Sequence, residues 1–170
     1  SKERLDYTFS KHTDKSVEVA LEWEKWRIPF TVETDLVNTT LAFIRTQLTG
    51  ALGFDPPSLE AAANWCLLNN VNYEEGLDWI NRATDPNLGA VKSFRALSTK
   101  AGLLTKLNRT AEADTIMKAA LETATVVEMH QYGRQLQAQK KYTEAFTIFE
   151  KNYKKHKGAW PTNAGMMRGY

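Results

Sequence analysis

The sequence contains one cysteine, three histidines and almost no excess of charge of either sign. Because Cys66 has no second cysteine to pair with, no intrachain disulfide can form. The 22 Lys and Arg residues against 20 Asp and Glu give a net charge of +2, which excludes a strongly basic nucleic-acid binder and an acidic tail. No apolar run approaches the roughly 18–20 residues needed to span a bilayer. The 42% of hydrophobic and 11% of aromatic residues exclude a disordered chain.

Motifs that carry catalysis or bind metal ions are also missing from the sequence. None of His12, His130 and His156 has a second His, Cys or acidic residue at helical ligand spacing, so the sequence predicts no metal site. There is no Gly-x-Ser-x-Gly elbow and no glycine-rich loop that could hold a phosphate. We therefore expect no catalytic residues and no cofactor. A hydrolase is less favoured than the two other functions considered below, an interaction module and an architectural brace.

Residues 4–34 alternate between apolar and polar side chains, a pattern typical of strands with one polar face. One side carries ten large apolar residues: Leu5, Tyr7, Phe9, Val17, Val19, Leu21, Trp23, Ile28, Phe30 and Val32. Glu18, Glu22 and Glu24 fall on the opposite side, where solvent disfavours a role as a catalytic pair. The pattern predicts a three-stranded antiparallel meander over residues 1–34. Pro29 has no amide hydrogen, which places the third strand at an edge.

The apolar period changes from two to helical spacing at residue 35, where Asp35 is a typical N-cap. Four residues then share one face of a predicted linking helix within 35–50: Val37, Leu41, Ile44 and Leu48. We expect this helix to pack on the apolar face of the meander. The sheet surface or edge that the helix leaves open is expected to pair with a second copy of the chain, which gives a homodimer.

From residue 57 onwards the sequence indicates helix after helix, and the helices form repeating pairs. The four units begin near these residues: Pro57, Phe94, Val126 and Trp160. Small residues such as Gly133 and Ala145 recur where paired helices would touch, and large ones such as Phe149 recur between pairs. This pattern is typical of tetratricopeptide repeats. The sequence therefore predicts a mainly α fold (α+β overall), with a tetratricopeptide-like α–α superhelix over residues 57–170.

The two ends of the chain indicate a fragment. The first six residues contain neither an initiator methionine nor the apolar core of a signal peptide, so we expect a processed or engineered N-terminus. The fourth helical unit is incomplete, which would leave an apolar helix face without its usual partner. We therefore expect residues 160–170 to be poorly ordered or to pack against another molecule through Met166, Met167 and Tyr170.

Two stretches add a resemblance to a known family, and the Trp-Glu-Lys strand end followed by Pro-Phe is its most specific piece. They are Val19-Ala20-Leu21-Glu22-Trp23-Glu24-Lys25 followed by Ile28-Pro29-Phe30, and Leu67-Leu68-Asn69-Asn70 in the helical part. Together with the order of a meander, a capped helix and helical hairpins, they resemble the C-terminal half of the exported bacterial family catalogued as domain of unknown function 2911. The resemblance implies a periplasmic or otherwise exported protein whose signal peptide and upstream β-rich region lie outside this chain. The family has no established activity, so the resemblance implies no mechanism.

Fixed positions on the first helix of each tetratricopeptide pair line an inner, concave surface. Nine residues at these positions are candidate peptide contacts: Trp65, Asn69, Arg95, Ser98, Lys106, His130, Arg134, Gln137 and Arg168. Four of them are cations, and the positions include no acidic residue. We expect this inner surface to bind an extended peptide with acidic residues or a free C-terminal carboxylate, which arginine can hold through two hydrogen bonds. The alternative is that these side chains are ordinary solvated residues.

Lysines outnumber acidic residues between Lys140 and Lys157. Cations in a last helical turn stabilise the helix dipole, and the aromatic residues nearby occupy core positions, so we expect no nucleic-acid partner. The expected function is a non-enzymatic protein- or peptide-interaction module of an exported bacterial protein. The alternative is an architectural helical brace for a missing N-terminal β-domain that carries the ligand site.

Overall fold

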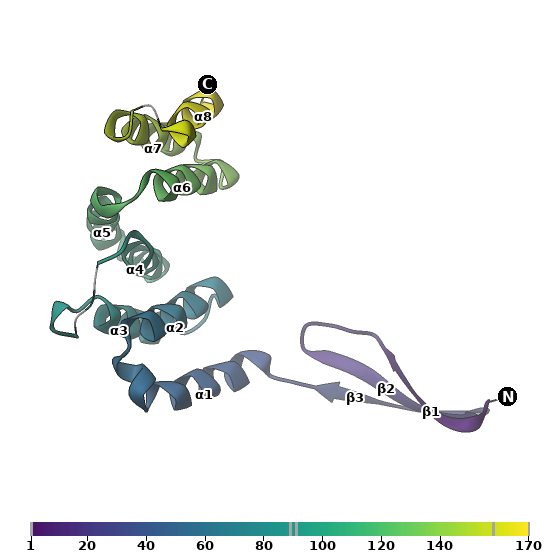
Figure 1. Cartoon of the computed structure of the whole chain (residues 1–170). Coiled ribbons are helices and arrows are strands. Elements are labelled where there is room, and N and C mark those ends of the chain that lie inside the picture. The colour runs from purple at the N-terminus through teal and green to yellow at the C-terminus, as the bar shows by residue number, and fades with distance from the viewer. Residues whose placement is uncertain (1, 89, 91, 158, 170) are drawn as a thin grey trace. The chain divides into compact units, whose positions relative to one another are not determined.

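The computed structural model describes residues 2–88, 90, 92–157 and 159–169, without the side chains of residues 2, 3, 168 and 169. The chain divides into two compact units, residues 1–49 and 50–170. The described residues form three strands, eight α-helices and two short 3-10 helices (Figure 1). The predicted mainly α fold with an N-terminal antiparallel sheet is therefore confirmed.

The first unit contains an antiparallel sheet in the order β1-β2-β3. Its strands are β1 (Lys2–Ser10), β2 (Ser16–Glu24) and β3 (Trp26–Glu33). Val19 pairs with Phe9 on one side and Phe30 on the other, which places these apolar side chains on one face. Pro29 lies on the edge strand β3, as its missing amide hydrogen predicts.

The polar face of the sheet is held by a network around Glu18. Its carboxylate accepts hydrogen bonds from Lys11 Nζ at 2.6 Å, from Arg27 Nη2 at 2.7 Å and from Ser10 Oγ at 3.1 Å. Arg27 also pairs with Glu22 at 3.4 Å. The hydrogen bonds from Lys11 and Arg27 lower the pKa of Glu18 from 4.5 to about 2. Glu18 and Glu22 are thus structural ion-pair partners whose side chains are 12% and 23% exposed, so only Glu24 is solvated as expected.

This lowered pKa predicts an acid-sensitive sheet. Because folding depresses the pKa of Glu18, its stabilising contribution is complete above pH 4.5 and is lost as the pH falls toward about 2. We expect the unfolding midpoint of the sheet, followed by NMR of β2 amides in denaturant, to fall over this range. Glu18→Gln should flatten the dependence, whereas Glu24→Gln, at the exposed end of the same strand, should preserve it. A sheet in which both variants titrate like the wild type would contradict the role given to Glu18.

The apolar face of the sheet is open. The exposed fractions are 63% for Phe9, 50% for Phe30 and 72% for Trp26, which pairs with Trp23 and joins this face. Helix α1 (Leu36–Leu48) does not cover these side chains, so the expected packing of the linking helix on this face is wrong.

The local sequence accounts for the start of α1 directly after the sheet. Only two residues separate β3 from α1, and the second of them, Asp35, accepts a hydrogen bond from the Asn38 amide at 3.1 Å. The helix therefore begins before the chain has formed a loop that would return it over the sheet. Of the predicted stripe on α1, Leu41 is buried and the other three residues are half-buried.

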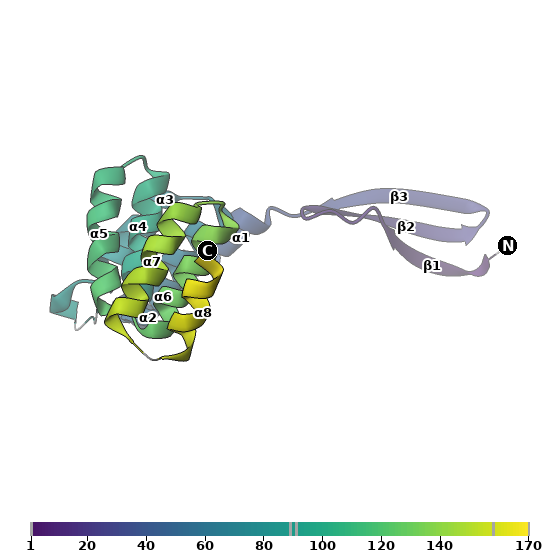
Figure 2. The same cartoon turned by 90° about the horizontal axis from the view of Figure 1, so that it is seen from above.

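The second unit is a stack of helical hairpins. After the 3-10 helix η1 (Ala51–Phe54), the elements are α2 (Pro56–Asn69), α3 (Tyr73–Ala83), the 3-10 helix η2 (Pro86–Leu88), α4 (Phe94–Lys106), α5 (Thr110–Thr123), α6 (Val126–Ala138), α7 (Tyr142–Lys155) and α8 (Trp160–Gly169). Helix α2 pairs with α3, α4 with α5, and α6 with α7, while α8 packs on α6 and α7 (Figures 1 and 2). The first helices of the units begin within one residue of the predicted starts.

The three hairpins share one turn geometry. Each turn contains a left-handed residue, and the first turn has a second one at Asn72, with φ of 46°. The residues that the three turns share are Asn70, Asn108 and Lys140, with φ of 55°, 62° and 62°. The next residue in each turn donates its amide hydrogen to a carbonyl five residues earlier, as in Arg109 to Leu104 at 2.9 Å. The same bond forms at 3.1 Å in the first turn and at 2.9 Å in the third. This hydrogen bond ends the first helix of each pair and reverses the chain.

The third hairpin closes around Phe149, whose side chain is 1% exposed. It packs in a cluster with Met129, Leu136 and Ile148, and Met166 of α8 contacts the same cluster. A methyl group on Gly133 would overlap the Phe149 ring, so the absence of a side chain at this position lets α6 approach α7. In α8, Met167 is 82% exposed. The expectation for Tyr170 lies outside the described residues.

Candidate functional site

The candidate peptide contacts lie on the first helices of the hairpins. Trp65 and Asn69 are on α2, Arg95, Ser98 and Lys106 are on α4, and His130, Arg134 and Gln137 are on α6. Arg168 is on α8, and its side chain lies outside the described part of the structure. In Figure 1, α3 lies to the left of α2 and α5 to the left of α4, whereas α7 lies above α6 and beside α8.

On α2, the candidate residues form a partly apolar surface. Trp65 is half-buried, and the exposed Asn69 side chain donates a hydrogen bond to the Trp65 carbonyl at 2.9 Å. Leu68, between them in the sequence, is 70% exposed. This end of α2 therefore offers a peptide apolar contact area more than charge.

Arg95 on α4 is oriented by an acid from the preceding hairpin. Its Nε donates a hydrogen bond to Glu60 Oε1, and the Glu60 side chain is only 12% exposed whereas that of Arg95 is 74% exposed. The contact uses Nε, and no hydrogen bond to a described residue engages the two terminal nitrogens. Arg95 therefore presents the outer end of its guanidinium to solvent in a fixed direction. Ser98 donates its hydroxyl hydrogen to the Arg95 carbonyl at 2.9 Å and supports the same turn of helix.

Lys106 joins α4 to the turn of the first hairpin. Its ammonium donates a hydrogen bond to Asn70 Oδ1 at 2.7 Å and lies 5.9 Å from the centre of the Tyr73 ring. Both contacts connect residues more than thirty positions apart and tie the second hairpin to the first. Both partners are uncharged, so Lys106 keeps its positive charge while these contacts hold its ammonium in place.

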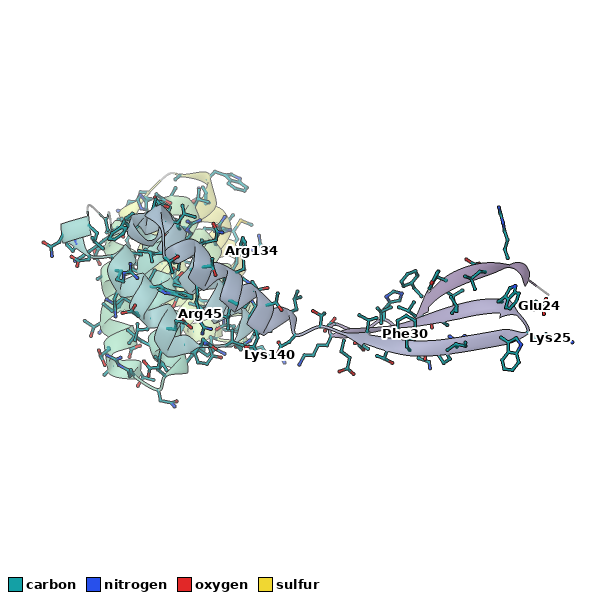
Figure 3. All side chains as sticks on the ribbon, turned by 90° about the horizontal axis from the view of Figure 1, so that it is seen from below. Glu24, Lys25, Phe30, Arg45, Arg134 and Lys140 are labelled. Atoms are coloured by element: carbon teal, nitrogen blue, oxygen red, sulfur yellow. The ribbon has the colours of Figure 1, made fainter. Side chains whose placement is uncertain are left out.

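Helix α6 contributes one outward cation and one packed imidazole. Arg134 is exposed and forms no hydrogen bond or ion pair with another described residue (Figure 3). His130, by contrast, is half-buried, with its ring centroid 5.6 Å from that of Phe149 and its Nδ1 beside Gly165. Gln137 is half-buried as well. Of the three predicted α6 contacts, Arg134 is exposed, whereas His130 and Gln137 are half-buried like Trp65 on α2.

The sequence reasoning missed the groups that hold the cations. Glu60, Asn70 and Tyr73 contact Arg95 or Lys106 and belong to the site, yet none was among the predicted contacts. Glu60 occupies a repeat position that is usually aromatic. This unusual acid was the one feature of the sequence that could have indicated a charged contact there. Its partner lies 35 residues away, so the pairing follows only from the stacking of the hairpins.

The basic segment near the C-terminus is engaged in helix contacts. Lys155 Nζ donates to the Glu122 carbonyl at 2.8 Å and to the Ala124 carbonyl at 3.2 Å at the end of α5. Lys151 pairs with Glu122 at 2.7 Å, and Lys154 pairs with Glu150 at 2.7 Å. These contacts match the interpretation of the lysine run as helix-stabilising charge.

Within the residues that the structure describes, no three His, Cys, Asp or Glu side chains gather in a way that could hold a metal ion. Over the same residues, no helix combines the length and the apolar character required to cross a membrane. Comparisons with protein-family models, with curated proteins and with solved structures find no match for this chain.

Proposed function

We propose that the chain is a non-enzymatic interaction module of an exported bacterial protein, and that the inner helices α2, α4 and α6 bind an extended peptide. The ligand carries an acidic residue or a free C-terminal carboxylate. The exported compartment and the relation to the domain of unknown function 2911 rest on the sequence resemblance and form part of this proposal.

The presentation of Arg95 is the observation that carries the proposal. Glu60 fixes the guanidinium through Nε, which leaves the two terminal nitrogens to donate a pair of hydrogen bonds to a carboxylate. Because the side chain is held in place before binding, less conformational entropy is lost when a ligand arrives. Arg134 on the next inner helix supplies a second exposed guanidinium.

The remaining inner residues suit the rest of a peptide. The half-buried Trp65 and exposed Leu68 provide apolar area, and Asn69 provides an amide beside them. An extended peptide with a carboxylate at Arg95 or Arg134 and an apolar side chain toward α2 would use both kinds of contact. Lys106 contributes positive potential while it remains bonded to Asn70.

Charge reversal tests the proposal. We expect Arg95→Glu combined with Arg134→Glu to weaken binding of a fluorescein-labelled acidic peptide with a free C-terminus at least tenfold, as measured by anisotropy. The loss follows because each substitution removes a charge-assisted donor and adds a repelling carboxylate.

The matched control reverses two lysines that lie outside the inner helices, Lys118 and Lys157, to glutamate. It makes the same change in net charge and should leave affinity within about twofold. Equal losses in the two double variants, with unchanged melting curves, would show that only overall charge matters and would contradict the proposal.

An uncovered sheet favours a second role for the first unit. We propose that the apolar face of β1, β2 and β3 pairs with the same face of a second copy, so that the module acts as a homodimer. The exposed side chains of Phe9, Trp26 and Phe30 support this proposal. In the architectural alternative, the helices brace an upstream β-domain that lies outside this sequence. That domain would then cover the apolar face of the sheet.

A further inference from the structure

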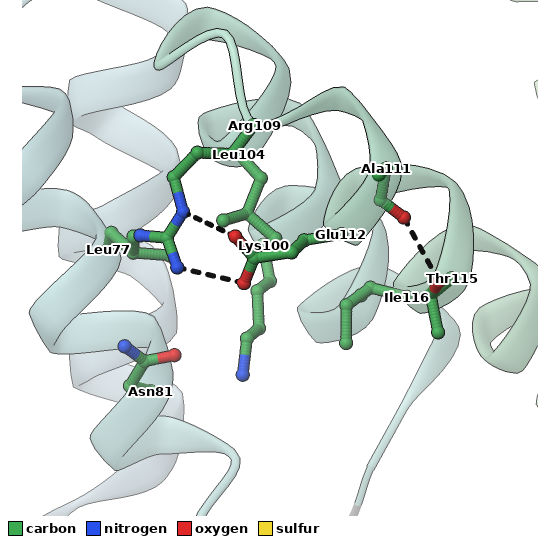
Figure 4. A pocket seen from close by; sticks show the side chains of 9 residues that line it. All are labelled: Leu77, Asn81, Lys100, Leu104, Arg109, Ala111, Glu112, Thr115 and Ile116. Carbon is green, nitrogen blue, oxygen red and sulfur yellow. Dashed lines mark hydrogen bonds and ion pairs between the residues drawn. The ribbon is translucent and has the colours of Figure 1, made fainter.

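A pocket of about 500 Å³ lies between α3, α4 and α5, away from the candidate peptide contacts. Helix α4 contributes Lys100 and Leu104 to the pocket, on the side of the helix that faces α3 and α5. Nine residues line the pocket (Figure 4): Leu77, Asn81, Lys100, Leu104, Arg109, Ala111, Glu112, Thr115 and Ile116. Its volume falls in the range of small-molecule sites.

Two of the three charged side chains that line the pocket are paired with each other, and the third is not. Arg109 donates to Glu112 through Nε at 2.7 Å and through Nη2 at 2.8 Å, so these two side chains neutralise each other. Lys100 forms no hydrogen bond or ion pair with any described residue. Figure 4 shows its amine in the pocket, apart from the Arg109–Glu112 pair and on the side of Asn81. Partial burial lowers the pKa of Lys100, which indicates an ammonium with few compensating contacts.

The exposed side-chain amide of Asn81 also lines the pocket. It forms no hydrogen bond with another described residue, and it lies on the same side of the pocket as the Lys100 amine (Figure 4). Figure 4 shows the Asn81 oxygen toward the Lys100 amine and the nitrogen away from it. A half-turn of the Asn81 amide exchanges these two atoms. The ammonium and the amide N–H can then each donate a hydrogen bond to one oxygen of a carboxylate. Leu77 and Leu104 are buried, and Ile116 is half-buried on α5, so these three residues give the lining an apolar part.

We propose that this pocket binds a small amphiphilic carboxylate. The carboxylate lies between Lys100 and Asn81, and a short aliphatic or aromatic tail packs against Leu77, Leu104 and Ile116. A single unpaired cation suits a monoanion better than a doubly charged phosphate, because Arg109 is already bonded to Glu112. Binding would restore a partner to a half-buried ammonium and remove the apolar tail from water. The proposal does not depend on peptide binding at the inner helices.

Titration with hexanoate tests this proposal by NMR of the whole chain, with acetate and 1-hexanol as comparison ligands. We expect hexanoate to shift amide signals of α3, α4 and α5, and to bind at least tenfold more tightly than either comparison ligand. Lys100→Met preserves the length of the side chain and removes the charge, and should weaken hexanoate at least tenfold. Lys118→Met, on the exposed side of α5, should change affinity less than twofold.

Three results would overturn the proposal. They are unchanged hexanoate affinity in Lys100→Met, equal binding of 1-hexanol, and equal binding of acetate, which would indicate general ion association. Asn81→Ala provides a second variant at an exposed position that does not depend on the buried part of α4. It should weaken hexanoate several-fold while leaving 1-hexanol unaffected, and equal effects on both ligands would also contradict the assignment.

Discussion

Replacing Phe149 by alanine is expected to lower the free energy of unfolding of the helical unit by about 3–5 kcal/mol. The ring is 1% exposed, and it contacts α6 at Gly133 and α8 at Gly165 while its own helix is α7. Its removal leaves a cavity among three helices, since the glycine backbones on either side carry no side chains that could fill it. Chemical denaturation followed by far-UV circular dichroism measures the loss.

Tyr142→Ala supplies the matched control on the same helix. Tyr142 is 64% exposed, so truncating it should change the free energy of unfolding by less than about 1 kcal/mol. Similar effects of the two substitutions would mean that α6, α7 and α8 do not close around Phe149 in solution.

Introducing a charge on the apolar face of the sheet is expected to turn a dimer into a monomer. Strands of nine, nine and eight residues form a face about 30 Å long and roughly 10–15 Å wide. Each face then covers about 300–450 Å², so two faces packed together bury about 600–900 Å². This is below the roughly 1,200 Å² of stable specific interfaces, so we expect a weak dimer that forms at high concentration. A face this apolar is uncommon on a soluble monomer. Light scattering at high micromolar concentration should give twice the mass of the 19.3 kDa chain, and Trp23→Glu should give a single chain mass.

The control for this experiment places a charge on the opposite face. Thr31 pairs with Glu18 on the polar side of the sheet, so Thr31→Lys, whose ammonium lies opposite an acid, should leave the dimer intact. A wild-type chain that remains a monomer at high micromolar concentration would contradict the proposed pairing, as would a dimer that Trp23→Glu does not affect.

The sheet was predictable because its information is local. Alternation fixes which side chains share a face, and Pro29 restricts β3 to an edge. The helix starts were predictable for the same reason, since small residues and caps recur at regular distances. The shared left-handed residue in the three turns was not expected, because Asn70 and Asn108 favour that conformation but Lys140 does not.

The candidate site was predicted less completely, because its electrostatics depend on contacts between hairpins. The sequence placed Arg95, Lys106 and Arg134 on first helices, but it did not show that Glu60 holds Arg95 or that Asn70 holds Lys106. His130 was expected to be a peptide contact, and its position beside Phe149 and Gly165 follows from the packing of α8, which periodicity does not encode. The predicted packing of α1 on the sheet was wrong for a similar reason. Apolar periodicity identifies which side of a helix is buried, but it does not identify the element against which that side packs.

Amide chemical-shift mapping with an acidic peptide tests whether the inner helices bind a carboxylate through Arg95 and Arg134. The isotope-labelled chain is titrated with a peptide that ends in a free carboxylate, and with an amidated version in which each acid is replaced by its amide. We expect the acidic peptide to shift signals around Arg95 on α4 and Arg134 on α6, and the amidated peptide to bind at least tenfold more weakly. Shifts confined to α3, α5 and α7, or equal binding of the two peptides, would contradict peptide binding at the inner helices.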